Sequence, residues 1–175
     1  IRTASAFYLP NRYNESFIAG WGNADTFVFV TKSPLFQQRP LALAKLSVET
    51  DPSNGQRFIQ YCEKPIGRIE IQQFDECPGD NRVRFVSGMR QIEFACVGWK
   101  DRFTQLSSNA QWNVGIHQRP QWRDSFLAAD DQITPFLMKI TTSPVNTSVL
   151  PRTLFFRFAD ENPRILSTFY GAVNE

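Results

Sequence analysis

The chain has 175 residues, of which 42% are hydrophobic and 21% are charged, which suits one compact soluble domain or one domain with an extension. The net charge is +2 and no basic run exceeds two residues, so the composition argues against a nucleic-acid-binding arm. No apolar stretch approaches the roughly 18 residues of a membrane span. The single histidine, His117, excludes a two-His metal site.

Turn signals divide the chain into short runs rich in β-branched and aromatic residues. Several runs alternate: Val83 and Phe85 are apolar, whereas Arg82 and Arg84 between them are charged. This alternation is typical of antiparallel strands with one face on a core and one in water. The predicted strands lie near residues 26–32, 41–49, 57–61, 66–73, 82–86, 91–99, 110–116, 135–142, 152–158 and 164–170.

Helical signals are weak. The segment 122–132 can hold a short helix, because Asp124 or Ser125 can cap it. Ten short strands without long helices predict an all-β fold, an antiparallel β-sandwich of jelly-roll-like type. We expect residues 1–118 to form the sandwich. The polar segment 119–134 would connect it to C-terminal strands, and residues 119–175 would join the same sandwich or extend it.

Few residues offer catalytic or metal-binding chemistry. A Ser-His-Asp or Cys-His set would need His117, and a lone histidine is more often a surface or hydrogen-bonded residue. The acidic residues Asp75, Glu76 and Asp80 surround a turn. They form either a calcium site or, as the absence of regular spacing favours, a solvated acidic turn. We therefore predict a protein that is not an enzyme and has no cofactor.

Two tryptophans have contrasting positions. Trp99 begins the charged loop 99–102, where an indole can stack on the apolar face of a sugar, so it is a candidate ligand contact. Trp112 lies inside an alternating run and is predicted to be a core residue.

The segment 57–116 carries a series of motifs in a characteristic order. They are Tyr61-Cys62-Glu-Lys-Pro65, an apolar strand ending at Phe74-Asp75, Asn81-Arg82-Val83, Phe94-Ala-Cys96-Val-Gly-Trp99-Lys100-Asp101 and Trp112-Asn-Val-Gly-Ile116. This order resembles the H-type lectin domain of the snail agglutinins, which are specific for N-acetylgalactosamine. The resemblance covers about a third of the 175 residues.

The resemblance implies a sugar site, and we expect four of its residues to lie together at one edge of the sandwich: Arg82, Trp99, Lys100 and Asp101. The fifth is Asp51, on the turn before the predicted strand 57–61, which would supply the acidic ligand. Lys100 departs from the family, which has histidine there, and this puts the preference for N-acetylgalactosamine in doubt. For Arg82, a salt bridge on the sheet surface is the alternative role.

The resemblance also implies a disulfide between Cys62 and Cys96, which would leave Cys77 free. It implies glycans of the N-acetylgalactosamine or galactose type as partners, and a homo-oligomer, with a trimer favoured, because single sugar sites bind weakly. The expected location is secreted or extracellular, in keeping with possible glycan-acceptor sites at Asn14 and Asn146.

Two functions therefore follow from the sequence. The first is a glycan-binding lectin-like module that acts as an oligomer. The alternative is a structural assembly or attachment protein, such as a viral coat or spike domain of jelly-roll type on a virion surface. Many phenylalanines and the absence of a catalytic set favour this alternative.

Overall fold

The computed structural model describes residues 4–5, 7–10, 16–38, 40–66, 74, 76, 79–101, 103–104, 120–131 and 133–158. Most of these residues lie in antiparallel strands, so the predicted all-β class is confirmed. The elements are β1 (Ala4–Ser5), β2 (Phe7–Pro10), β3 (Ser16–Ala19), β4 (Trp21–Gly22), β5 (Thr26–Thr31), β6 (Ala42–Thr50), β7 (Arg57–Pro65), β8 (Arg82–Gly98), β9 (Gln121–Arg123), β10 (Phe126–Leu127), α2 (Ala128–Asp131), β11 (Leu137–Pro144) and β12 (Arg152–Arg157).

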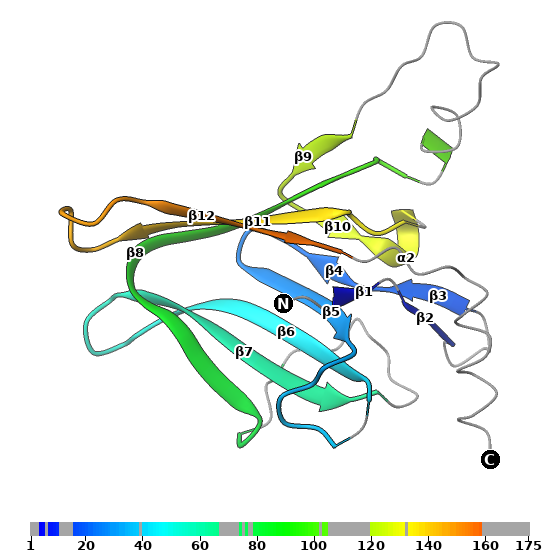
Figure 1. The fold of residues 1–175 in the computed structure, drawn as a ribbon, viewed down its shortest axis with the longest axis horizontal. Coiled ribbons are helices and arrows are strands. Elements are labelled where there is room, and N and C mark those ends of the chain that lie inside the picture. The colour runs from blue at the N-terminus through cyan, green and yellow to red at the C-terminus, as the bar shows by residue number, and fades with distance from the viewer. Residues whose placement is uncertain are drawn as a thin grey trace, which may run out of the picture.

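One curled sheet holds most of these strands in the order β10-β4-β5-β6-β7-β8-β11-β12, with β1 on β5 and β9 on β8. A separate hairpin consists of β2 and β3. The sheet curls into a half-barrel, so that the layer of β5, β6 and β7 faces the layer of β11 and β12 (Figure 1). The result resembles a sandwich whose two layers are joined through one strand.

That joining strand is β8. Its first part pairs with β7, from Arg82 opposite Cys62 to Met89 opposite Arg57, and its second part pairs with β11 up to Val97. Between them the backbone bends at Val86 and Gly88, which have φ angles of 51° and 77°. The sequence predicted two strands, 82–86 and 91–99, around a Ser-Gly turn. The prediction of a turn is wrong, because the chain bends there and continues as one strand.

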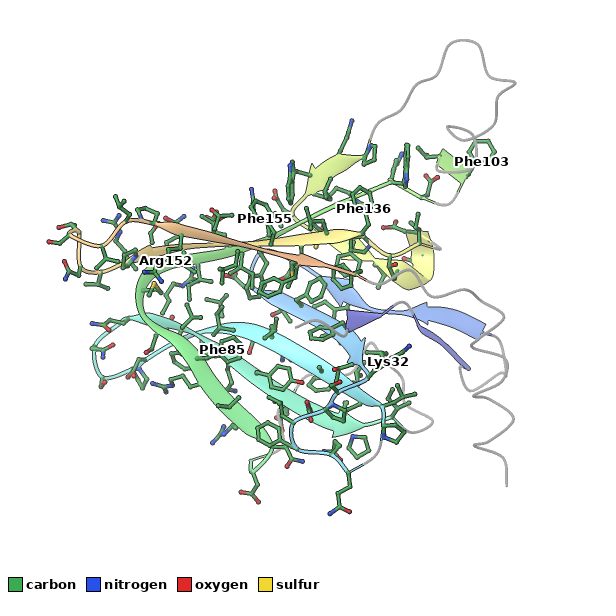
Figure 2. The ribbon with its side chains drawn as sticks, in the orientation of Figure 1. Lys32, Phe85, Phe103, Phe136, Arg152 and Phe155 are labelled. Carbon is green, nitrogen blue, oxygen red and sulfur yellow. The ribbon has the colours of Figure 1, made fainter. Side chains whose placement is uncertain are left out.

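The core fills the inside of the curl. Alternate residues of β5, β6, β7, β8 and β11 point inward, as expected from the period of two in a strand, and many of their side chains pack together between the layers (Figure 2). Phe27 is central, since its ring centroid lies 5.3 Å from those of both Phe126 and Phe158.

The outer face of β5, β6 and β7 is buried as well. Val28, Val30 and Leu43 point to this face and are at most 1% exposed. Phe74 is fully buried beside it, with the ammonium groups of Lys45 and Lys64 at 6.0 and 4.4 Å from its ring centroid. Burial on both faces accounts for the continuous apolar run at 27–30, which breaks the simple alternation.

The short helix expected within segment 122–132 is found as one turn near its end, and it begins after the expected caps Asp124 and Ser125. This segment forms β9, β10 and the single turn α2. Predicted strands 110–116, 164–170 and most of 66–73 lie outside the described residues. The described part of 119–175 contributes β11 and β12 to the same sheet as the strands of 1–118. In the described part of the chain, no helix has the length and apolar character needed to cross a membrane.

The predicted Cys62–Cys96 disulfide is wrong, because Cys96 carries a free, buried thiol. The register explains the separation. Cys62 lies opposite Arg82 at the start of β8, whereas Cys96 lies near its end, between Met138 of β11 and Arg123 of β9. A disulfide needs Cα atoms within about 7 Å, and strands rise about 3.3 Å per residue. Cys77 lies outside the described residues.

Candidate functional site

A hollow of about 240 Å³ opens where the β6–β7 turn meets the bend of β8. Its walls carry charged and amide side chains, and we call it the polar hollow. It is lined by Asp51, Asn54, Gln56, Arg57, Phe58, Arg84, Ser87 and Gly88. Two segments far apart in the sequence, 51–58 and 84–88, thus meet at one place.

Local hydrogen bonds fix the turn that forms one wall. The Asp51 N–H donates to the Gln56 carbonyl at 2.8 Å, and the Gly55 N–H donates to the Asp51 carbonyl at 2.8 Å. The Asn54 side chain accepts from the Gln56 N–H at 2.9 Å, in an Asx turn. Gly55 has φ 69°, a left-handed conformation that glycine adopts without strain. The turn therefore holds its polar groups in place before any ligand arrives.

Arg84 is the best-positioned cation of the polar hollow. Its guanidinium carbon lies 3.6 Å above the centroid of the Phe58 ring, and its Nη1 donates to Asp51 Oδ2 at 2.8 Å. Stacking and ion pairing together restrict the guanidinium plane. The Arg84 side chain remains 49% exposed, so further N–H donors of this group face solvent.

Asp51 is held as a carboxylate. Its Oδ1 accepts from the Ser53 hydroxyl at 2.6 Å and from the Ser53 N–H at 3.0 Å. These two bonds, followed by the contact with Arg84, lower the pKa of Asp51 to about 2. The polar hollow therefore presents a permanent acceptor at neutral pH.

Arg57 supplies a second guanidinium at the same place. Its Nη2 lies 3.3 Å from Asp25 Oδ1, and its Nη1 donates to the Ile92 carbonyl at 3.5 Å. These contacts reach from β7 to the loop before β5 and to the second part of β8. Arg57 thereby ties the polar hollow to both layers of the sheet.

The structure divides the sequence-predicted sugar site. Asp51 lines the polar hollow, whereas Arg82 is exposed at the start of β8, opposite Cys62, and does not line it. Trp99, Lys100 and Asp101 follow the other end of this 17-residue strand. The bend of β8 also turns its two ends into different layers (Figure 1). The structure does not bring Arg82 together with the Trp99 loop.

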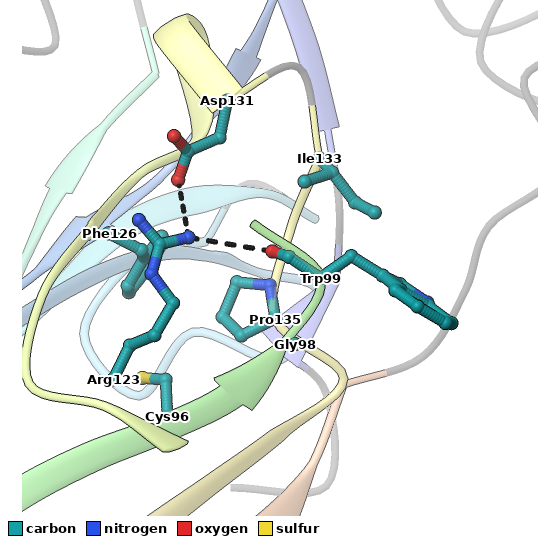
Figure 3. A pocket seen from close by; sticks show the side chains of 8 residues that line it. All are labelled: Cys96, Gly98, Trp99, Arg123, Phe126, Asp131, Ile133 and Pro135. Carbon is teal, nitrogen blue, oxygen red and sulfur yellow. Dashed lines mark hydrogen bonds and ion pairs between the residues drawn. The ribbon is translucent and has the colours of Figure 1, made fainter. Parts of the chain in front are cut away.

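The loop that begins at Trp99 is held by hydrogen bonds from Arg123 of β9. Arg123 donates to the carbonyls of Trp99 and Lys100 at 3.5 and 3.1 Å and to Asp131 at 2.9 Å. The cavity there measures only about 10 Å³, room for about one water molecule, and the Trp99 indole points away from it (Figure 3). Asp101 accepts from the Thr104 N–H at 2.7 Å, which lowers its pKa. These contacts organise the loop without forming a sugar-sized hollow.

Sequence reasoning did not select Arg84, Arg57 or Phe58. The alternation in 82–86 placed Arg84 on the same polar face as Arg82, and that is a signal available from sequence. The choice between the two arginines depends on which of them reaches Asp51, and this depends on the pairing of β7 with β8.

The structure gives no support to the candidate metal site at the acidic turn. Glu76 and Asp80 are exposed, and the described residues contain no cluster of three metal-binding side chains. Asp75, Trp112 and His117 lie outside the described residues.

No protein-family model matches the chain, and no curated protein matches it. The resemblance to H-type lectins therefore stays a prediction, and any proposal of function rests on the geometry of the site.

Proposed function

We propose that this protein is a glycan-binding module and that the polar hollow holds one sugar residue. One observation carries the proposal: Arg84, fixed on the Phe58 ring and on Asp51, stands half-exposed at the wall of an open polar hollow. A guanidinium held in this way can make directed hydrogen bonds with little loss of side-chain entropy.

The chemistry of the lining suits a polyol. Each sugar hydroxyl both donates and accepts, and the polar hollow offers Asp51 as acceptor, Arg84 and Arg57 as donors, and the amides of Asn54 and Gln56 for both roles. Its volume of about 240 Å³ lies below the 300–1,000 Å³ typical of drug-sized ligands. The ligand that fits is therefore a single ring, with the galactose and N-acetylgalactosamine types implied by the resemblance as the first to test.

A glycan array with purified protein tests the proposal. Arg84→Ala removes a charge-assisted contact of about 1.5–3 kcal/mol and should weaken binding about tenfold or more. Arg82→Ala is the matched control, since it removes the same charge from the same face of β8 outside the polar hollow. We expect Arg82→Ala to bind as the parent does.

Two outcomes contradict the proposal. The parent binding no glycan on a broad array would exclude it. If Arg84→Ala binds as tightly as the parent, sugar binding does not occur in the polar hollow, and a stronger loss in Arg82→Ala would return the site to the arginine that the sequence favoured.

The alternative function is assembly or attachment, and a specific surface supports it. Trp122 and Phe155 are 48% and 58% exposed on the outer face of the β9, β8, β11 and β12 layer. Their ring centroids lie 6.4 Å apart, and Lys139 Nζ lies 4.6 Å from the Trp122 ring. Exposed neighbouring aromatic side chains are typical of contact surfaces, so this face supports self-association, as the lectin proposal also requires.

A further inference from the structure

A second, larger cavity of about 500 Å³ lies between the two layers of the half-barrel. We call it the apolar cavity. Its inner residues Phe29, Ile59 and Ile140 come from both layers and are at most 3% exposed. At its rim, Leu35 and Leu154 are 69% and 43% exposed, so the cavity opens to solvent between them.

The lining contains no charged side chain. The walls are aliphatic and aromatic, and the polar members are two hydroxyl residues, Thr31 and Ser33, and Tyr61. The Tyr61 hydroxyl donates its proton to the buried carboxylate of Glu63, so it is not free to donate to a ligand. A charged ligand would lose its hydration here without gaining a counter-charge, so the lining selects an uncharged one.

The walls of the apolar cavity are fixed by unusual local structure. Val86, which lines it, has φ 51°, a conformation that β-branched residues rarely adopt and that other contacts must maintain. This conformation contributes to the bend of β8 that carries the strand from one layer to the other. Phe85 lies between the layers beside it (Figure 2), with its ring centroid 6.4 Å from that of Tyr61.

Glu63 holds the backbone of Leu35 and Phe36 at the rim of the apolar cavity. Its two carboxylate oxygens accept from the backbone N–H groups of Leu35 and Phe36 at 2.7 and 2.9 Å. This holds Leu35 at the rim, and it places the Phe36 ring 6.4 Å from that of Tyr61. A buried carboxylate that accepts three protein hydrogen bonds gives this side of the opening a defined position.

We infer that the apolar cavity is a binding site for one uncharged, mainly apolar small molecule. Its volume of about 500 Å³ is within the range of small-molecule sites, and its walls come from a rigid sheet on both sides. This site is separate from the polar hollow, shares no lining residue with it and does not depend on glycan binding.

Titration with N-phenyl-1-naphthylamine, an uncharged dye that fluoresces in apolar surroundings, tests the inference. The parent should bind one dye per chain with saturation. Leu154→Arg and Leu35→Arg each place a charge at the rim from opposite sides and should weaken binding about tenfold or more, because burying an unpaired charge is costly. Leu35 is mostly exposed and Leu154 is nearly half exposed, so the fold should tolerate the changes.

Leu150→Arg is the matched control, since this residue is 80% exposed between β11 and β12 and does not line the apolar cavity. It should bind the dye as the parent does. Absence of saturable binding by the parent would overturn the inference, as would rim variants that bind as tightly as the parent or a control weakened to the same extent. A cavity filled by another segment of chain would give the first of these results.

Discussion

Asp51 and Arg84 show how short-range contacts set the charge at the polar hollow. The Ser53 hydroxyl and N–H make the two contacts that lower the pKa of Asp51 most, and Arg84 adds to them. Asp51 is close to solvent, so the ion pair with Arg84 serves to orient the guanidinium more than to stabilise the fold. The contacts of the Asp51 carboxylate, with Ser53 first and Arg84 after it, stabilise the fold above the ordinary aspartate pKa of 3.8, and this effect is lost as the pH falls through about 2.

We expect the Asp51 carboxyl to titrate near pH 2 in an NMR titration of side-chain carbons. Ser53→Ala should raise this midpoint, because it removes the side-chain hydrogen bond that stabilises the charged form. The backbone N–H of residue 53 remains and keeps part of the effect. A midpoint near 4 in the parent would show that these contacts do not form in solution.

Cys96 provides a second test at the residue scale. Burial raises the pKa of its thiol to about 12, with the positive charge of Arg123 acting in the opposite direction. At pH 8 the thiolate is therefore scarce, and Ellman's reagent should not react with Cys96 in the folded protein. After denaturation without a reductant it should react. Rapid reaction of the folded protein, or a Cys62–Cys96 linked peptide in a non-reduced digest, would contradict the structure.

At the scale of elements, runs rich in β-branched and aromatic residues between turn signals were predictable as strands from the sequence. The predicted strands 26–32, 41–49 and 152–158 agree within one residue at each end with β5, β6 and β12. The short strands β1 to β4 were missed, since two to four residues give too little pattern to recognise. The short helix within 122–132 starts later than the capping signal at Asp124 or Ser125 indicated, because β9 and β10 pair there with distant strands and this pairing overrides the local signal.

The site was only partly predictable, for a related reason. Asp51 was selected as a turn acid ahead of β7, and it does line the polar hollow. Arg82 was chosen because the resemblance places a sugar-binding arginine in the Asn81-Arg82-Val83 motif. The arginine that reaches Asp51 is Arg84, and this depends on the β7–β8 register, which no local pattern reveals. The bend within β8 was hidden as well, because Ser87-Gly88 has the composition of an ordinary turn.

The bend of β8 can be tested through Gly88. With φ 77° it occupies the left-handed region, and a Cβ there would meet only the end of the Gln56 side chain at 3.7 Å. Gly88→Ala should therefore destabilise the protein through backbone conformation alone, by about 1–2 kcal/mol in urea denaturation. Gly79→Ala is the control, because Gly79 lacks a left-handed φ and has open space around it. Equal stability of the two variants would contradict the bend.

At the scale of the whole molecule, the half-barrel leaves one layer open to association. The order of strands ends at β12, whose outer edge has no strand partner among the described residues. An unpaired edge beside exposed aromatic side chains is a common place for contact with another chain. The buried outer face of β5, β6 and β7 offers no such apolar surface, so association is expected through the β11 and β12 layer.

We expect a trimer of about 60 kDa by light scattering at micromolar concentration, from chains of 20.1 kDa. Phe155 lies on the outer side of its layer (Figure 2), and Phe155→Asp should shift the mass towards one chain, because a charge would be buried in the contact. Phe103→Asp is the matched control: this phenylalanine is 79% exposed but lies away from Phe155 (Figure 2). A parent of one-chain mass, or equal losses in both variants, would contradict association through this face. The proposed single-sugar site would then have no array of copies to strengthen its binding. A parent that still bound multivalent glycans tightly would have to do so through more than one site per chain.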